Sequence, residues 1–242
     1  GLNPAGGGVV LNEDEDTPLA DAGHPHLQVE LARARHPPPG HGDGRVLRLA
    51  RIAAAHDINF TMDAEEADRL ALSLKLLDRL AHEPSLGGWT GLGLAVQAYQ
   101  KRGLETIERV ADLARRSGRR LMVRLVKGAN LAMEKVEAVM HGWEQAPYTA
   151  KADVDANYLR CVERALRPDA VGALRIGVAS HNLYDVAAAH LLATDRGAQE
   201  SLDIEMLQGM SPAQARAVRD EVEQELVHLG SLKEKVLDET KK

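Results

Sequence analysis

The sequence is poor in cysteine and in aromatic residues, and each scarcity excludes a class of protein. Its 242 residues include a single cysteine, Cys161. An internal disulfide and a CxxC metal site are therefore both excluded, and we predict no metal centre. The same scarcity indicates a reducing, cytoplasmic location. Aromatic residues make up only 3% of the chain, which leaves few side chains for stacking on nucleic-acid bases.

Long apolar runs and clusters of positive charge are also missing. No apolar run approaches the roughly 18 residues of a membrane-spanning helix, and the N-terminus lacks the apolar core of a signal peptide. The net charge is −6, without a long basic cluster, so we expect no nucleic-acid partner. The hydrophobic fraction of 44% and the charged fraction of 27% are ordinary for a soluble globular protein.

The beginning of the chain differs in composition from the rest. Glycine and proline together fill 14 of the first 44 positions, and such a density without a period is typical of a linker or a disordered segment. We therefore predict a low-complexity tail at residues 1–44, one folded domain at residues 45–230 and a polar tail at residues 231–242.

The domain is organised around the nearly apolar run Leu121–Ala129. This run has no helical period and ends at a lysine and a glycine, which indicates a strand buried on both faces. Arg124 lies inside it, and Lys127 lies where it ends. A buried guanidinium needs a partner. The residues leave two alternatives open, an internal ion pair with Asp or Glu, or a ligand.

Strands and helices alternate along the domain at intervals of 30 to 40 residues. Such alternation predicts βαβ units around a parallel sheet. A barrel and an open doubly wound sheet would both fit this alternation. No GxGxxG sequence follows a strand, which favours the barrel. We therefore predict an α/β fold of the (β/α)8 TIM-barrel type, with about six βα units visible. The other predicted strands are Asp57–Met62, Leu92–Gln97, Arg175–Ser180 and Leu202–Leu207.

Polar residues follow the predicted strands, at the end where a barrel carries its active site. They include Asp63, Gln97, Lys127 and the pair Ser180-His181. Asp63 has a second interpretation, because with Glu66 it forms a capping box for the next helix. Lys127 also permits a Schiff-base lyase or aldolase, with Asp63 as proton shuttle. A third hypothesis is a partial barrel without catalytic activity.

Five motifs, in this order, resemble the proline dehydrogenase domain of bacterial proline utilization A flavoenzymes. The resemblance implies a (β/α)8 barrel that holds FAD and oxidises L-proline to Δ1-pyrroline-5-carboxylate by hydride transfer to the flavin. It covers roughly residues 46–219. The motifs are Asp63–Leu70, Gln97–Arg102, Arg124–Ala129, Ser180–Asn182 and Glu205–Met210.

The resemblance also implies roles for individual residues. Asp63 is expected near the substrate and the flavin, Arg124 beside the flavin, and Leu207 over the proline ring. These three are the expected catalytic residues. The expected cofactor-binding residues are Gln97, Arg124, Lys127, Gly128, Ala129, Thr149, Ser180 and His181.

The chain departs from the family pattern near its ends. No segment before Val46 matches the family's first strand, and no arginine pair for the substrate carboxylate follows Met210. We therefore expect an incomplete barrel with impaired proline oxidation. The resemblance further implies a quinone or membrane-pool electron acceptor, peripheral association with the inner membrane, and an oligomer or a fused aldehyde dehydrogenase module.

Overall fold

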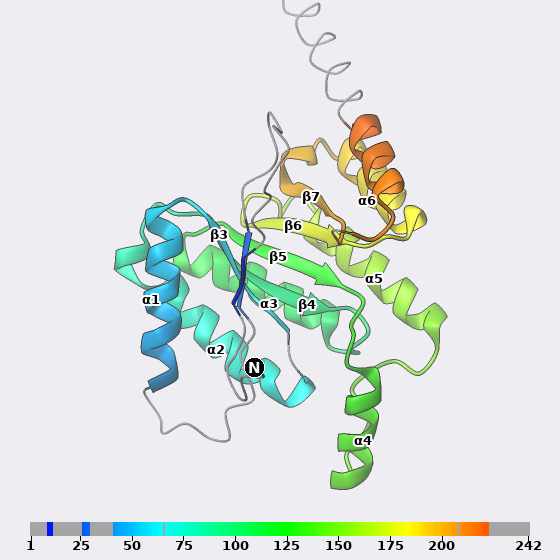
Figure 1. The fold of residues 1–242 in the computed structure, drawn as a ribbon, viewed down its shortest axis with the longest axis horizontal. Helices are drawn as coiled ribbons and strands as arrows, with labels where there is room; N and C mark the ends of the chain where they lie inside the picture. The colour runs from blue at the N-terminus through cyan, green and yellow to red at the C-terminus, as the bar shows by residue number, and fades with distance from the viewer. Residues whose placement is uncertain (1–8, 12–25, 30–40, 65, 208, 223–242) are drawn as a thin grey trace, which may run out of the picture. The chain divides into compact units, whose positions relative to one another are not determined.

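The computed structural model describes residues 9–11, 26–29, 41–64, 66–207 and 209–222. The chain divides into two compact units, Gly1–Glu205 and Met206–Lys242. The first unit is an α/β structure built on one sheet (Figure 1). In the second unit, residues 212–222 are helical, and Pro212 takes the first helical position, which suits its fixed φ angle.

Among the described residues, the sheet of the first unit has seven strands in the order β1-β2-β3-β4-β5-β6-β7. β1 pairs antiparallel with β2, and every later neighbour pairs in parallel. The predicted α/β class with a parallel sheet is confirmed, and this order suits a partial TIM barrel. The strands are β1 (Val9–Leu11), β2 (His26–Val29), β3 (Asn59–Met62), β4 (Leu92–Gln97), β5 (Leu121–Val126), β6 (Leu174–Ala179) and β7 (Leu202–Glu205).

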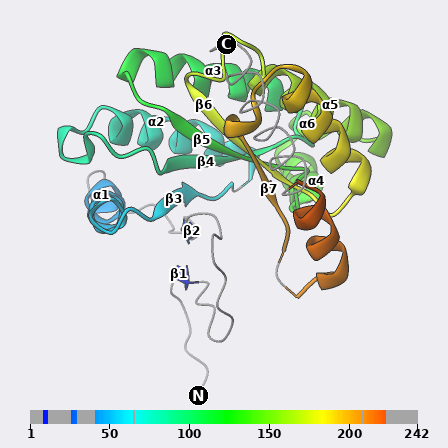
Figure 2. The ribbon, with the colours of Figure 1, turned by 90° about the horizontal axis from the view of Figure 1, so that it is seen from above.

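Helices connect the parallel strands, and most of them lie along one face of the sheet (Figure 2). None of the described helices is long and apolar enough to cross a membrane. The α-helices are α1 (His41–Ala55), α2 (Leu70–Ala81), α3 (Gly103–Ser117), α4 (Leu131–His141), α5 (Lys151–Ala165) and α6 (Leu183–Asp195). Short 3-10 turns accompany them at η1 (Ala67–Arg69), η2 (Pro84–Leu86) and η3 (Gln199–Ser201).

The two faces of the sheet differ in chemistry because side chains alternate along each strand. One face is apolar and packs on the helices, with Val123 of β5 and Ile176 of β6 in the hydrophobic core. The alternate positions form what we call the inner face, which carries small and polar residues such as Ala95, Arg124 and Gly177. The predicted burial of the β5 run is confirmed, because all of Leu121–Leu125 is buried. The inner face is therefore the one that offers polar groups.

The N-terminal segment contributes to the sheet, which the sequence did not predict. β1 and β2 lie within the residues predicted as a tail, and β2 pairs with β3 from His26 to Val29. Strands of three and four residues are too short to show a period of two among glycines and prolines. Helix α1 also begins within these residues, at His41. The proposed domain boundaries themselves stay predictions.

The predicted capping box at Asp63 is wrong. Helix α2 begins at Leu70, after the 3-10 turn η1, and its N-cap residue is Arg69 with no side-chain cap. The Asp63 carboxylate instead accepts a 2.9 Å hydrogen bond from the backbone N–H of Ala64. Short acidic side chains compete with helices through such local bonds, and here the local bond replaces the cap.

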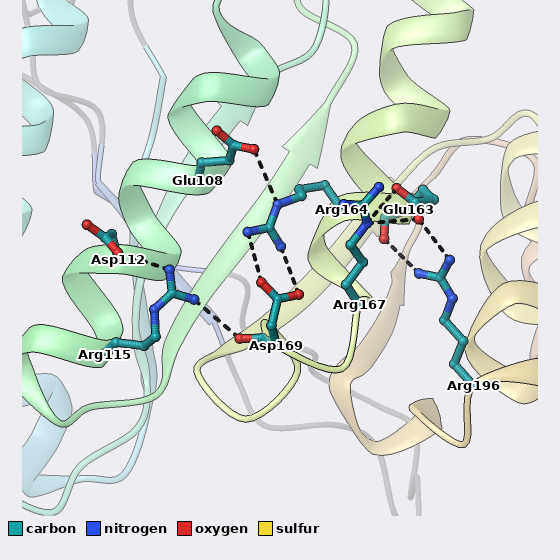
Figure 3. Close-up of polar contacts among 8 residues, drawn as sticks. All are labelled: Glu108, Asp112, Arg115, Glu163, Arg164, Arg167, Asp169 and Arg196. Carbon is teal, nitrogen blue, oxygen red and sulfur yellow. Dashed lines mark hydrogen bonds and ion pairs between the residues drawn. The ribbon is translucent and has the colours of Figure 1, made fainter.

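Ion pairs join α3, α5 and the loops that follow α5 and α6, near the end of the sheet where the strands begin (Figure 3). Arg164 of α5 lies 3.4 Å from Glu108 of α3 and 3.2 Å from Asp169, in the loop before β6. Glu163 pairs with both Arg167 and Arg196. Exposed pairs of this kind contribute about 0–1 kcal/mol each, and polar contacts at this end of a barrel serve stability. The functional residues are therefore sought at the opposite end.

Candidate functional site at the carboxyl ends of the strands

Lys127, directly after β5, forms ion pairs with two carboxylates. Its Nζ lies 2.6 Å from Asp155 Oδ1 of α5 and 2.8 Å from Asp185 Oδ2 of α6. Asp185 also accepts a 2.8 Å hydrogen bond from Ser180 Oγ, just after β6. The Asp185 side chain is only 4% exposed, against 31% for Asp155. The ends of β5 and β6 are thus joined through one buried carboxylate.

These contacts hold Lys127 in its charged form. Partial burial alone would lower the pKa of the Lys127 ammonium, but hydrogen bonds to Asp155 and Asp185 outweigh burial and raise it. The pKa of Asp155 is lowered in turn, mainly by its hydrogen bond with Lys127. The ammonium also lies 5.5 Å from the centre of the Tyr158 ring, within range of a cation–π contact. Lys127 is a fixed cation at neutral pH.

Arg124 on the inner face pairs with Glu205, at the end of β7. Arg124 Nε donates to Glu205 Oε2 at 2.5 Å, and the arginine is 8% exposed. The structure therefore shows the internal ion pair that was one of the two alternatives for Arg124. The contact spans β6, where Gly177 pairs in register with Arg124.

Gln97, the last residue of β4, belongs to a buried hydrogen-bonded cluster. Its Oε1 accepts from Gln100 Nε2 at 2.9 Å. Glu134 of α4 accepts from the Ala67 N–H at 2.8 Å, from the Tyr99 hydroxyl at 3.2 Å and from Gln100 Nε2 at 3.3 Å. Burial is the largest cause of the raised pKa of Glu134, and burial likewise raises the pKa of Tyr99. The cluster ties α4 to the end of β4.

Gly128 is required by both its conformation and its surroundings. Its φ angle is +123°, and a Cβ atom there would overlap the Tyr99 ring. Residues with a side chain rarely adopt this conformation. The segment before Thr149 is held against the same region, because the Tyr148 N–H donates to the Tyr99 carbonyl at 2.8 Å. Thr149 itself is exposed.

The remaining predicted residues are half-buried or exposed, and one of them belongs to the second unit. His181 is half-buried after β6, Ala129 is exposed after β5, and Asp63 is half-buried after β3. Leu207 lies in the second unit and is 65% exposed. Its packing on a substrate stays a prediction.

The sequence missed the carboxylates that organise this site. Asp155, Asp185 and Glu205 come from three different elements and contact residues up to 81 positions away. Only Asp185 gives a local signal, as an acidic residue in the first turn of a helix that follows a strand. Nothing local marks Asp155 or Glu205 as the partner of a particular cation.

The comparisons with known proteins show the family to which the chain belongs. The family model described as proline dehydrogenase matches residues 10–230. The chain belongs to the proline dehydrogenase family. The match includes residues before Val46, so the expectation that no family segment precedes Val46 is wrong.

Relatives of this proline dehydrogenase family member are longer proteins. The bifunctional protein PutA of Klebsiella aerogenes is 42% identical over 167 residues, which are 69% of this chain and 13% of the relative. The hydroxyproline dehydrogenase of Rattus norvegicus is 32% identical over 170 residues, which are 68% of this chain and 34% of the relative. The chain thus spans about an eighth of the PutA relative and a third of the other.

A solved structure supports the family fold. Proline utilization A from Corynebacterium freiburgense superposes with a TM-score of 0.67 at 42% identity, covering 74% of this chain and 19% of that one. This likeness agrees with a partial barrel of the proline dehydrogenase type.

Proposed function

We propose that this chain binds FAD at the carboxyl ends of β4, β5 and β6 and contributes to the oxidation of L-proline to Δ1-pyrroline-5-carboxylate. The observation that carries the proposal is the set of donors around three consecutive strand ends, in a chain of the proline dehydrogenase family. An amide, two cations, a hydroxyl and an imidazole come from Gln97, Arg124, Lys127, Ser180 and His181.

This donor set fits the chemistry of FAD. The pyrophosphate is an anion that needs cations and hydroxyl groups, and the ring edge has both donors and acceptors, which suit an amide. Bound FAD supplies an acceptor for a hydride. The small and polar inner face, with Ala95 and Gly177, also lacks the bulky branched layers that fill an ordinary barrel interior.

The chain's own residues bind the cofactor and fix its orientation. Lys127 stays protonated because of Asp155 and Asp185, so it acts as a fixed charge toward an anionic group. Arg124 offers a guanidinium that is oriented by Glu205, and a fixed cation beside a flavin favours its anionic reduced form. Gly128 lets the backbone approach a ligand closely. Thr149 and Ala129 extend the proposed cofactor site, and Asp63 belongs to the proposed substrate site.

The Schiff-base alternative is not favoured. A nucleophilic lysine needs a lowered pKa so that the neutral amine is present, whereas the pKa of Lys127 is raised by two carboxylates. Borohydride treatment with a carbonyl substrate is therefore expected to leave Lys127 unmodified. We further propose that a fused aldehyde dehydrogenase module accompanies this domain, in keeping with the bifunctional relatives. A quinone acceptor and an oligomer stay predictions.

The test is anaerobic addition of L-proline to the FAD-loaded chain while the flavin absorbance is recorded. The proposal expects a yellow protein whose flavin band is bleached by L-proline and not by D-proline. A yellow protein that proline leaves unbleached would identify the non-catalytic partial barrel. A protein that remains colourless after incubation with FAD would refute the cofactor assignment.

A further inference from the structure

One ion pair on the inner face of the sheet crosses a whole strand. Arg124 belongs to β5 and Glu205 to β7, and β6 lies between them. Gly177 of β6 pairs in register with Arg124 on one side and with Asp203 on the other. The Glu205 side chain reaches the guanidinium by passing over Gly177.

Gly177 is needed for space and not for its backbone conformation. A Cβ atom at this position would overlap Glu205 Oε1. The glycines with a positive φ angle do not include Gly177, so alanine can adopt its backbone conformation. The overlap involves only the end of a flexible side chain. Alanine at position 177 is therefore expected to displace the carboxylate without unfolding the sheet.

The neighbouring arginine does not compete with Arg124 for Glu205. The other inner-face arginine of this region, Arg175, donates to Asp203 Oδ1 at 2.6 Å. Each of the two arginines thus has its own carboxylate on β7. The Arg124 and Glu205 side chains are 9% and 18% exposed, so water screens their interaction only weakly.

We infer that Gly177 and Glu205 together position the guanidinium of Arg124 for the flavin, Gly177 by leaving space and Glu205 by holding the charge. The inference rests on the proposed FAD site. Neither residue is a catalytic group, because both act through Arg124. Their role is to fix the orientation of the cation and to balance part of its charge.

The test is a double-mutant cycle on the full 242-residue chain. The variants are Gly177→Ala, Glu205→Ala and the double variant. Gly172→Ala is the matched control, because a Cβ at Gly172 meets nothing within 4 Å and its φ is not positive. The first readout is the dissociation constant of FAD, measured by titration at one salt concentration.

We expect Gly177→Ala and Glu205→Ala each to weaken FAD binding about tenfold, which corresponds to about 1.4 kcal/mol. The double variant is expected to bind no more weakly than Glu205→Ala, because the added methyl group then has no carboxylate to displace. Gly172→Ala should bind as wild type. The inference would be overturned if Gly177→Ala weakened FAD binding equally in the wild-type chain and in Glu205→Ala. It would also be overturned if Gly177→Ala alone bound FAD as tightly as wild type.

A second readout separates a structural role from a positioning role. Glu205→Gln keeps an acceptor for Arg124 but removes the negative charge. FAD affinity is expected to stay within about threefold of wild type, since the acceptor is kept, while the reduction potential of the bound flavin rises because Arg124 is no longer balanced. An unchanged potential would overturn the positioning role.

Thermal unfolding of the same variants without FAD separates this inference from the proposed function. Failure of wild type to bind FAD refutes the proposed function. Non-additive losses of stability in the FAD-free variants then still support the pairing across Gly177. Additive losses overturn it, whatever the flavin result.

Discussion

Replacement of Asp185 by asparagine tests the contact that joins the ends of β5 and β6. Asp185 accepts from Ser180 Oγ and Lys127 Nζ, both at 2.8 Å, and its side chain is 4% exposed. Asparagine has nearly the same shape and keeps one acceptor oxygen, but it removes the charge. Any loss of stability therefore reports mainly the electrostatic part of the contact.

The expected loss of stability depends on the contacts that Lys127 keeps after the substitution. Removing one partner of a fully buried ion pair costs about 3–5 kcal/mol. Lys127, however, is 27% exposed and retains Asp155 at 2.6 Å, so its charge stays partly compensated. We expect Asp185→Asn to lower the free energy of unfolding by about 1–2 kcal/mol. In a domain of this size, that loss lowers Tm by about 2–8 °C.

Asp155→Asn is the matched control. It makes the same chemical change on the same lysine and also weakens the exposed pair with Lys151. Because the Asp155 side chain is 31% exposed, a loss of only about 0–1 kcal/mol is expected. Urea denaturation at pH 7, with far-UV circular dichroism as the signal, measures both variants. A loss in Asp155→Asn as large as that in Asp185→Asn would refute the reasoning, since burial would then not decide the strength of the contact.

Three further predictions concern other parts of the first unit. The pKa of Glu134 is raised from 4.5 mainly by burial, with the like charges of Glu66 and Asp68 also contributing. The contribution of Glu134 to the free energy of unfolding should therefore be fully present below pH 4.5 and be lost as pH rises through its folded-state pKa. Glu134→Gln, which keeps the Oε1 acceptor, should lack this pH-dependent loss in urea denaturation, while Glu137→Gln on the same helix should show it as wild type does. Asp63→Ser is expected to leave Tm nearly unchanged but to impair proline turnover with an artificial acceptor, and normal turnover would remove Asp63 from the site. Arg164→Met should lower the stability by about 1 kcal/mol with unchanged FAD affinity in titration, whereas weakened FAD binding would contradict its placement at the structural end of the sheet.

The sequence predicted those features of the fold that depend on local patterns. The strand β5 was predicted from a continuous apolar run, and the parallel sheet was predicted from the alternation of strands and helices. The strands β1 and β2 were missed because each has at most four residues. The cap at Asp63 was predicted wrongly because the capping-box pattern does not reveal a 3-10 turn inserted before the helix.

The candidate site was predictable only in part, for a related reason. The donors Gln97 and Lys127 stand at strand ends and Arg124 stands inside a strand, and these positions can be read from the sequence. Their partners depend on tertiary packing, since Lys127 meets Asp155 and Asp185 only when α5 and α6 fold back against the sheet. The sequence pattern of a strand thus predicts where a polar residue lies, but it does not predict which residue from a distant element will pair with it.

A titration of the 242-residue chain with FAD, followed by quenching of flavin fluorescence, tests the central claim most directly. The account predicts saturable binding of one FAD per chain, weakened at least tenfold in both Arg124→Ala and His181→Ala, because each loses a donor to an anionic or polar group. Arg164→Met, which also removes one positive charge, should bind as wild type. No saturable binding by wild type, or unchanged binding by both site variants, would contradict the claim that these strand ends form a flavin site.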